Sequence, residues 1–90
     1  MTVMTNDEIF SILQEECAEV IQAISKCRRF GMDTNYAHRG TNRQLLEAEL
    51  GDVLAMIDLL IKNDEVNKSV LEIAKINKME KLRRWSTIEV

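Results

Sequence analysis

The chain has 90 residues, of which 30% are charged and 46% hydrophobic, and its formal net charge at neutral pH is −3. This mildly negative charge argues against nucleic acid as a partner, because nucleic-acid binders carry a basic surface. The longest apolar stretch, Val53 to Ile61, is interrupted by Asp58 and is far shorter than the roughly 20 residues that span a bilayer. The N-terminal residues also lack the basic and apolar regions of a secretory signal. We therefore expect a cytoplasmic protein with no membrane partner.

The composition favours helices, since the chain has three glycines and no proline to interrupt them. A chain of this length buries only about 60% of the surface that its unfolded form exposes, so a lone protomer would be marginally stable. We expect an all-α fold with a single domain over residues 1–90. The small helical protomer should form an oligomeric helix bundle, as a homodimer or homotetramer.

A first helix is predicted over residues 6–30. Thr5 and Glu8 have the spacing of a capping box at its start, and Gly31 is placed to end it. Residues 31–41 contain two glycines and show no hydrophobic periodicity, so we predict a loop there.

A second helix is predicted over residues 42–62 and a third over residues 66–85. The polar segment Asn63 to Glu65 separates them. Lys and Arg residues gather at the C-terminal end of the third helix, where the helix dipole favours cations.

Acidic residues interrupt the apolar face predicted for the first helix. At about 100° per residue, Glu16 falls inside this face and Glu19 lies at its margin, close to Glu15. The apolar stripe itself consists of Ile9, Leu13, Val20, Ile24 and Cys27, with Ile12 and Ala23 along its edge. An unpaired carboxylate is costly to bury, so a cation or hydrogen bonds should compensate these charges.

The second helix shows the same anomaly. Its polar wedge is narrow, and Glu49 and Asp52 both project from its apolar part: Glu49 between Met56 and Leu60, and Asp52 between Leu45 and Leu59. The wedge contains Glu47, Gly51 and Asp58. A helix that is apolar over most of its circumference is usually surrounded by other helices. We expect the two acidic pairs to face each other.

Four converging carboxylates are typical of a site for a hard divalent cation with oxygen ligands. The predicted ligands are Glu16, Glu19, Glu49 and Asp52. A di-iron bundle would use histidines on its helices, whereas the single histidine, His38, lies in the loop. Mg²⁺ is therefore the expected cofactor, with Mn²⁺ as the other candidate.

The third helix carries cations on the continuation of its apolar face. Asn77, Lys81 and Arg84 follow this face, and Lys78 and Lys26 of the first helix are further candidates. These residues either cover apolar surface with their long side chains or bind phosphate beside the metal. Both interpretations remain open.

Two acidic motifs resemble the EExxE and ExxD motifs of MazG-like all-α nucleoside triphosphate pyrophosphohydrolases. They are EECAE, with Glu15, Glu16 and Glu19, and ELGD, with Glu49 and Asp52. The segments around them look most like the short phage-type members, which would place the protein in the host cytoplasm. The resemblance covers roughly residues 9–85.

The resemblance implies an oligomeric helical enzyme that cleaves a nucleoside triphosphate (NTP or dNTP) to the monophosphate and pyrophosphate. By this similarity Glu16, Glu19, Glu49 and Asp52 would hold Mg²⁺, and Glu15 would be a further ligand or the base that orients water. Positively charged side chains would then neutralise phosphate charge in the transition state. The residues expected to bind substrate are Lys26, Asn77, Lys78, Lys81 and Arg84.

The predicted loop and the end of the third helix offer less specific candidates. Polar residues there could contact a base or ribose, or be simply solvated. They are Tyr36, His38, Arg39, Asn42 and Arg43. Trp85 could stack on a base or pack against a partner helix.

Two other functions fit the same residues. A related hydrolase, such as a dimeric dUTPase or a phosphoribosyl-ATP pyrophosphohydrolase, would use the same acids on another substrate. A non-catalytic helical interaction module would instead pair the acids with Lys78, Lys81 and Arg84 of another chain. Dependence on Mg²⁺ separates the module from an enzyme, because salt bridges need no metal.

Overall fold

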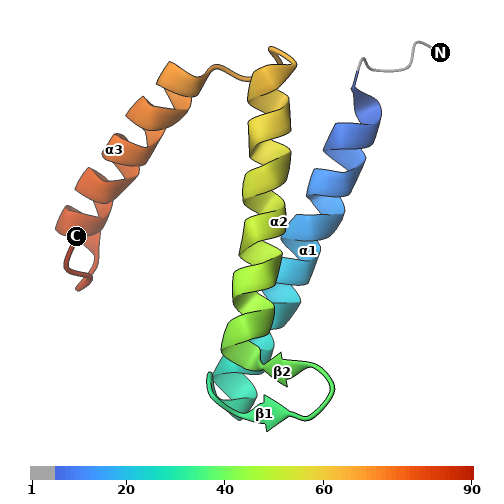
Figure 1. The fold of residues 1–90 in the computed structure, drawn as a ribbon. Coiled ribbons are helices and arrows are strands. Elements are labelled where there is room, and N and C mark those ends of the chain that lie inside the picture. Colours follow the sequence, from blue (N-terminus) through green and yellow to red (C-terminus); the bar gives the residue numbers. More distant parts are fainter. Residues whose placement is uncertain (1–5) are drawn as a thin grey trace. The chain divides into compact units, whose positions relative to one another are not determined.

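A computed structural model describes residues 6–90, which form three helices and a small hairpin (Figure 1). The elements are α1 (Asp7–Phe30), β1 (Asn35–Tyr36), β2 (Gly40–Thr41), α2 (Asn42–Lys62) and α3 (Lys68–Trp85). The chain divides into two compact units, Met1–Leu59 and Leu60–Val90, which are described separately below. Among the described helices, none combines the length and the apolar character that crossing a membrane requires. The all-α fold class is confirmed.

Helix α1 begins at Asp7, directly after Asn6, whose φ of 63° places its backbone in the left-handed region. Asp7 and Glu8 in the first turn and two arginines in the last turn complement the helix dipole. The helix ends as predicted at Gly31, whose φ of 95° favours glycine and whose N–H donates to the carbonyl oxygen of Cys27. The predicted cap Thr5 lies outside the described residues.

The segment predicted as a loop contains a short antiparallel hairpin, so the prediction of irregular structure there was incomplete. Strands β1 and β2 pair with Asn35 opposite Thr41 and Tyr36 opposite Gly40. The N–H of Arg39 donates to the carbonyl oxygen of Tyr36 across 2.9 Å and closes the turn. Strands of two residues are too short to show the alternation by which sequence reveals a strand.

Helix α2 has the predicted bounds. A reciprocal capping box fixes its start: Gln44 N–H donates to Thr41 Oγ1, and Thr41 N–H donates to Gln44 Oε1. At its other end Asp64 adopts a φ of 59°, and Glu65 N–H donates to the carbonyl oxygen of Leu60. This left-handed residue turns the chain out of the helix.

Helix α3 begins at Lys68, two residues later than predicted. The side chain of Asn67 accepts a hydrogen bond from the N–H of Val70 and so acts as the N-cap. Val66, which the periodicity assigned to the helix, therefore lies before it.

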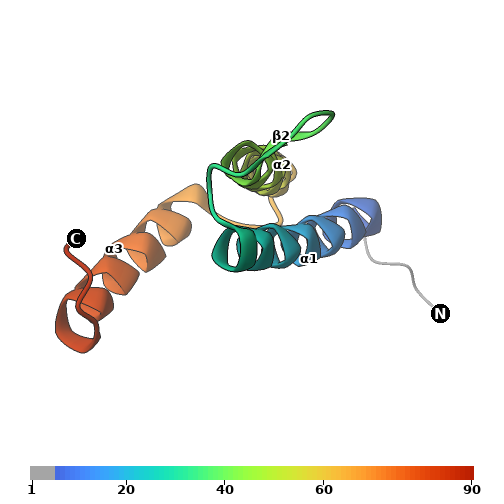
Figure 2. The same cartoon turned by 90° about the horizontal axis from the view of Figure 1, so that it is seen from below.

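Helices α1 and α2 of the first unit lie side by side in both views of the ribbon (Figures 1 and 2). The buried apolar side chains of the described chain are Ala23 and Cys27 on α1 and Met56 and Leu60 on α2. The phase predicted for α1 was partly wrong: Ile24, expected in the stripe, is 42% exposed, whereas Ala23, expected at its edge, is 1% exposed. A small side chain at the contact lets two helix backbones approach closely, which favours Ala23 over Ile24 there.

Candidate metal centre

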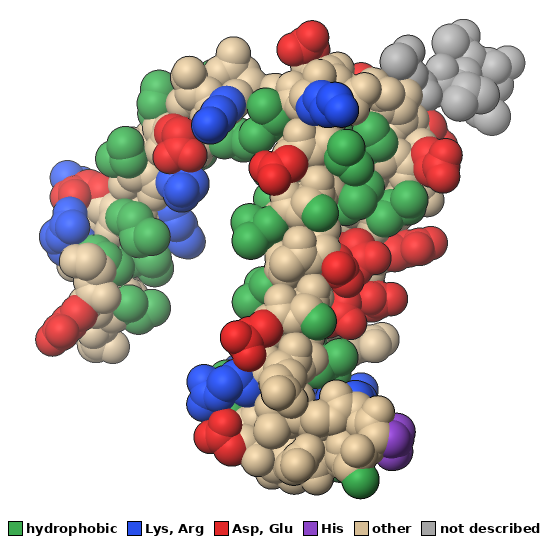
Figure 3. Space-filling model, in the orientation of Figure 1, with side chains coloured by type: hydrophobic (Ala, Val, Ile, Leu, Met, Phe, Trp, Pro, Cys, Tyr) green, Lys and Arg blue, Asp and Glu red, His purple; other side chains and the backbone are tan. Residues whose placement is uncertain are grey.

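Four carboxylates meet between α1 and α2 within the first unit. Glu16 and Glu19 come from α1, and Glu49 and Asp52 come from α2. Each offers one oxygen, and these four oxygens all lie within 4.8 Å of one another. Acidic side chains gather at this place in the space-filling view (Figure 3). The two acidic pairs therefore face each other, as their spacing along the helices predicts.

The four side chains differ in burial. Glu16 and Glu49 are half-buried, whereas Glu19 and Asp52 are exposed. The expectation that all four acids would be embedded in an apolar face was therefore wrong for Glu19 and Asp52. Each exposed acid lies three residues from a half-buried one on the same helix, so the cluster has one side toward the helix contact and one toward solvent.

Two oxygen atoms of this cluster are buried without a hydrogen-bond partner among the described residues. They are Oε2 of Glu16 and Oε2 of Glu49, one from each helix. Buried polar atoms are nearly always satisfied in folded proteins, so each such atom needs an explanation. A cation held between the helices would supply the missing interaction for both.

The surroundings of both half-buried acids raise their pKa. A hydrogen bond with Glu19 raises the pKa of Glu49 to about 7, and desolvation and the charges of Glu19, Asp52 and Glu16 act in the same direction. Desolvation, followed by the charges of Glu19 and Asp52, also raises the pKa of Glu16. The ionised cluster is therefore unfavourable without a counter-ion.

The donor set fits a hard divalent cation. Mg²⁺ binds oxygen at about 2.0–2.1 Å, so two of its ligands are at most roughly 4.2 Å apart. The observed spread of 4.8 Å is slightly wider, so small side-chain movements would close the four oxygens around one ion. Carboxylate oxygens suit Mg²⁺ and Mn²⁺, and no histidine lies in the cluster.

Two further candidates lie on α1 outside this group. Glu15 is the neighbour of Glu16, and its side chain is exposed. Lys26 is also exposed, ten residues further along the helix. Neither is one of the four converging residues, so the roles assigned to them stay predictions.

The remaining predicted substrate-binding residues, Asn77, Lys78, Lys81 and Arg84, are exposed side chains of α3 in the second unit. Arg84 Nε lies 3.7 Å from Glu80 Oε1. The structure describes these residues along their own helix, and phosphate binding by them stays a prediction.

Several of the polar residues predicted for the loop form contacts within the protein that the sequence does not indicate. Asn42 is fully buried, which removes it from direct contact with a nucleotide. Arg43 forms an ion pair with Asp33, with Nε and Oδ1 3.0 Å apart. The guanidinium of Arg39 lies over the ring of Tyr36, 4.5 Å from its centroid. The T-x-x-Q spacing of Thr41 and Gln44 is a capping pattern that the sequence already shows, and it indicates that α2 begins directly after Thr41.

The sequence model of the MazG nucleotide pyrophosphohydrolase domain matches residues 4–85, which is most of the chain. The chain belongs to this family. No match was found among curated proteins or among solved structures. The MazG family consists of hydrolases that act on nucleotides and are typically metal-dependent, and the acidic cluster of this MazG domain can bind a metal. The family match includes both acidic pairs and the whole of α3.

Proposed function

We propose that this MazG domain is a Mg²⁺-dependent nucleoside triphosphate pyrophosphohydrolase. With water it would cleave an NTP or dNTP between the α and β phosphates, giving the nucleoside monophosphate and pyrophosphate. The observation that carries this proposal is the convergence of four carboxylates with two unsatisfied buried oxygens. Such a site suits a reaction whose substrate and leaving group both carry concentrated negative charge.

The proposed ligands of the ion are Glu16, Glu19, Glu49 and Asp52. A bound Mg²⁺ supplies Lewis-acid chemistry: it neutralises phosphate oxygens and lowers the pKa of a coordinated water. Glu15, exposed beside Glu16, would orient the attacking water or take its proton. Phosphate binding is assigned to the polar and basic residues Lys26, Asn77, Lys78, Lys81 and Arg84.

Several ion pairs form within residues 6–90. They join Asp33 to Arg43, Glu72 to Lys75, and Glu80 to Arg83 and Arg84. None of them involves the four clustered carboxylates. Within the described chain these acids therefore have no cationic side chain as an ion-pair partner, and Mg²⁺ dependence distinguishes a metal site from a module that pairs them with cations of another chain.

Substrate profiling tests the function. The protein should be incubated with canonical and modified NTPs and dNTPs, with dUTP and with phosphoribosyl-ATP, in Mg²⁺ or in chelator, and pyrophosphate release measured. We expect Mg²⁺-dependent release from at least one nucleoside triphosphate. Release confined to dUTP or phosphoribosyl-ATP would identify the related hydrolases instead, and no release from any substrate would contradict an enzymatic role.

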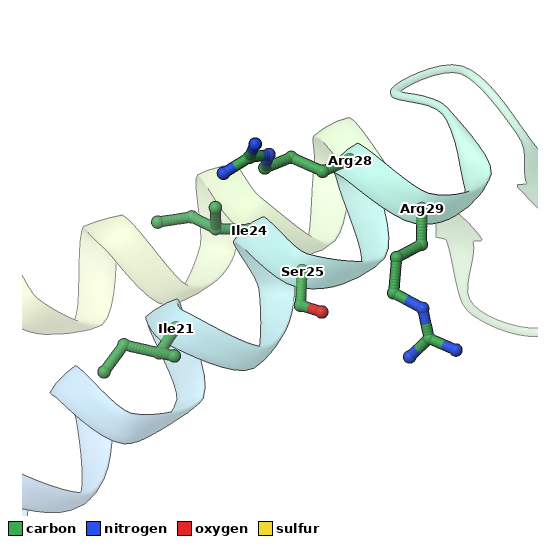
Figure 4. Close-up of a pocket in the computed structure, with 5 residues that line it drawn as sticks. All are labelled: Ile21, Ile24, Ser25, Arg28 and Arg29. Atoms are coloured by element: carbon green, nitrogen blue, oxygen red, sulfur yellow. The ribbon is translucent and has the colours of Figure 1, made fainter.

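We expect the protein to be an obligate homo-oligomer, a dimer or a tetramer. Large apolar side chains remain exposed in the first unit, with Ile21 68% exposed on α1 and Leu54 62% exposed on α2. An open hollow on α1 combines apolar and basic side chains (Figure 4). It is lined by Ile21, Ile24, Ser25, Arg28 and Arg29. Exposed apolar surface of this kind marks interaction sites.

Light scattering at low micromolar concentration checks this expectation, and a dimer or tetramer mass should be found. A monomer mass with retained helical circular dichroism would contradict it. If neighbouring subunits complete each active site, dilution below the dissociation constant of the oligomer should also lower the specific activity.

A single domain over residues 1–90 and a cytoplasmic location remain part of this proposal. The family match supports the first, because residues 4–85 extend over both compact units.

A further inference from the structure

The largest fully buried side chain of the described protein is polar. It belongs to Asn42, the first residue of α2, and its exposed fraction is 0%. A buried amide is costly unless its donor and acceptor are both satisfied. At Asn42 both the amide donor and the amide acceptor form hydrogen bonds, which compensate for the burial of this side chain.

Three hydrogen bonds converge on this residue. Asn42 Nδ2 donates to the carbonyl oxygen of Gly31 across 2.9 Å, and Arg39 Nη2 donates to Asn42 Oδ1 across 2.8 Å. The thiol of Cys27 donates to the backbone carbonyl oxygen of Asn42, with Sγ and O 3.5 Å apart. Asn42, the first residue of α2, is thus linked to the last turn of α1 through Cys27, to Gly31 at the end of that helix, and to Arg39 of the hairpin turn.

Arg39 is itself held in place. Its guanidinium lies over the ring of Tyr36, with 4.5 Å between Cζ and the centroid. A planar donor stacked on one face by an aromatic ring presents its N–H groups in a fixed plane. The amide of Asn42 is therefore oriented from both of its ends.

The hydrogen bonds of Asn42 lie about two helical turns from the acidic cluster, on both α1 and α2. Glu49 follows Asn42 by seven residues and Glu19 precedes Cys27 by eight, which corresponds to about 10 Å along α2 and about 12 Å along α1. Because a helix is stiff over two turns, a displacement of the start of α2 relative to the end of α1 also moves the carboxylates of α2 relative to those of α1.

We propose that Asn42 is a positioning residue for the metal centre, and that its buried hydrogen bonds set the separation between the acidic pairs of α1 and α2. This inference rests on the proposed metal site. The four oxygens lie within 4.8 Å of one another, slightly more than the roughly 4.2 Å that two ligands of one Mg²⁺ ion span, so the separation of the two helices decides whether small side-chain movements can close the site. Mg²⁺ demands near-ideal octahedral geometry, whereas Ca²⁺ accepts longer and less regular bonds.

The test is a comparison of Mg²⁺ and Ca²⁺ affinity, measured by titration calorimetry on the oligomer at a temperature where every variant is folded. Asn42→Ala should weaken Mg²⁺ binding at least about tenfold and Ca²⁺ binding far less, because only Mg²⁺ requires the strict geometry. Arg39→Ala removes one of the hydrogen bonds from a partly exposed position and should change the affinity ratio in the same direction. A residue that acts on stability alone would leave this ratio unchanged in the folded protein.

Arg43→Ala is the matched control. Arg43 is the next residue of α2 and links it to the loop through an exposed ion pair with Asp33, so its removal should leave both affinities within about twofold. If Asn42→Ala does not fold, Arg39→Ala decides the question. Equal Mg²⁺ to Ca²⁺ ratios in the parent and in the folded variants would overturn the positioning role. A parent that binds neither ion would instead overturn the metal site and this inference with it.

Discussion

The Asp52→Asn variant should lose pyrophosphohydrolase activity by at least about a hundredfold, which is the scale on which a ligand or charge-stabilising group acts. Asp52 offers one of the four converging oxygens and contacts Glu16 across the helix pair. Asparagine keeps the size of the side chain and removes its charge, so the helical fold and the proposed oligomer should survive. Steady-state kinetics over a range of Mg²⁺ concentrations checks this, together with circular dichroism and light scattering.

Glu47→Gln is the control for this prediction. Glu47 lies on the same helix, is exposed and is not among the four converging acids, so its replacement should leave turnover near the parental value. The metal-free Asp52→Asn protein should be at least as stable as the parent, because one repelling charge is gone. Near-parental turnover of Asp52→Asn with loss of activity in Glu47→Gln would contradict the assignment of the site.

Without metal, the protein should become less stable as the pH rises from about 4.5 to about 7. The pKa of Glu49 is about 7 in the fold against an ordinary 4.5, so the folded state holds this proton more tightly than the unfolded state does. The resulting stability is complete below the ordinary pKa and is lost as the pH rises through the folded pKa. The raised pKa of Glu16 adds to the effect. The pKa of Asp33 is lowered by Arg43, so its contribution to stability is lost only when the pH falls below this window.

Mg²⁺ should reverse this loss, because it binds ionised carboxylates. Ligand at a hundred times its dissociation constant adds about 2.7 kcal/mol to the free energy of unfolding, which raises the thermal midpoint by roughly 10–20 °C in a domain of this size. The increase should be largest above pH 7. Thermal unfolding followed by circular dichroism from pH 5 to pH 8, in chelator and in several millimolar Mg²⁺, measures both effects.

Glu49→Gln distinguishes the acidic cluster from other titrating groups. Glutamine cannot ionise, so the thermal midpoint of the metal-free variant should depend less on pH over this window, and Mg²⁺ should raise it less than in the parent. A parental midpoint that is unaffected by Mg²⁺ at pH 8 would favour the salt-bridged module over the enzyme.

The sequence allowed the helices to be placed closely because their ends carry local signals. Gly31 ends α1, and Asn63 to Glu65 separate α2 from α3, through backbone conformations that each residue type adopts locally. The start of α3 lies two residues later than predicted because the capping residue Asn67 sets it, although Val66 before it fits the apolar periodicity of the helix. The hairpin was not predicted because its strands, of two residues each, are too short to show the alternation of apolar and polar residues.

The acidic residues of the site could also be identified from sequence, because a spacing of three residues on a helix puts two side chains on one face. The pattern indicated two pairs and the need for a counter-ion. It could not indicate that Glu19 and Asp52 are exposed while Glu16 and Glu49 each bury an oxygen, since burial depends on how two helices far apart in the chain pack.

By itself, then, the sequence determined the all-α class, the position of α2 and the identity of the four acids, all of which follow from local propensity and helical periodicity. The tertiary structure decided the phase of the α1 contact, where the small Ala23 is buried and Ile24 is not. It also decided the raised pKa of Glu49 and the burial of Asn42, a polar residue that on sequence grounds could contact a nucleotide. These features depend on which surfaces of α1, the hairpin and α2 meet, and non-local contacts of this kind leave no periodic signal in the chain.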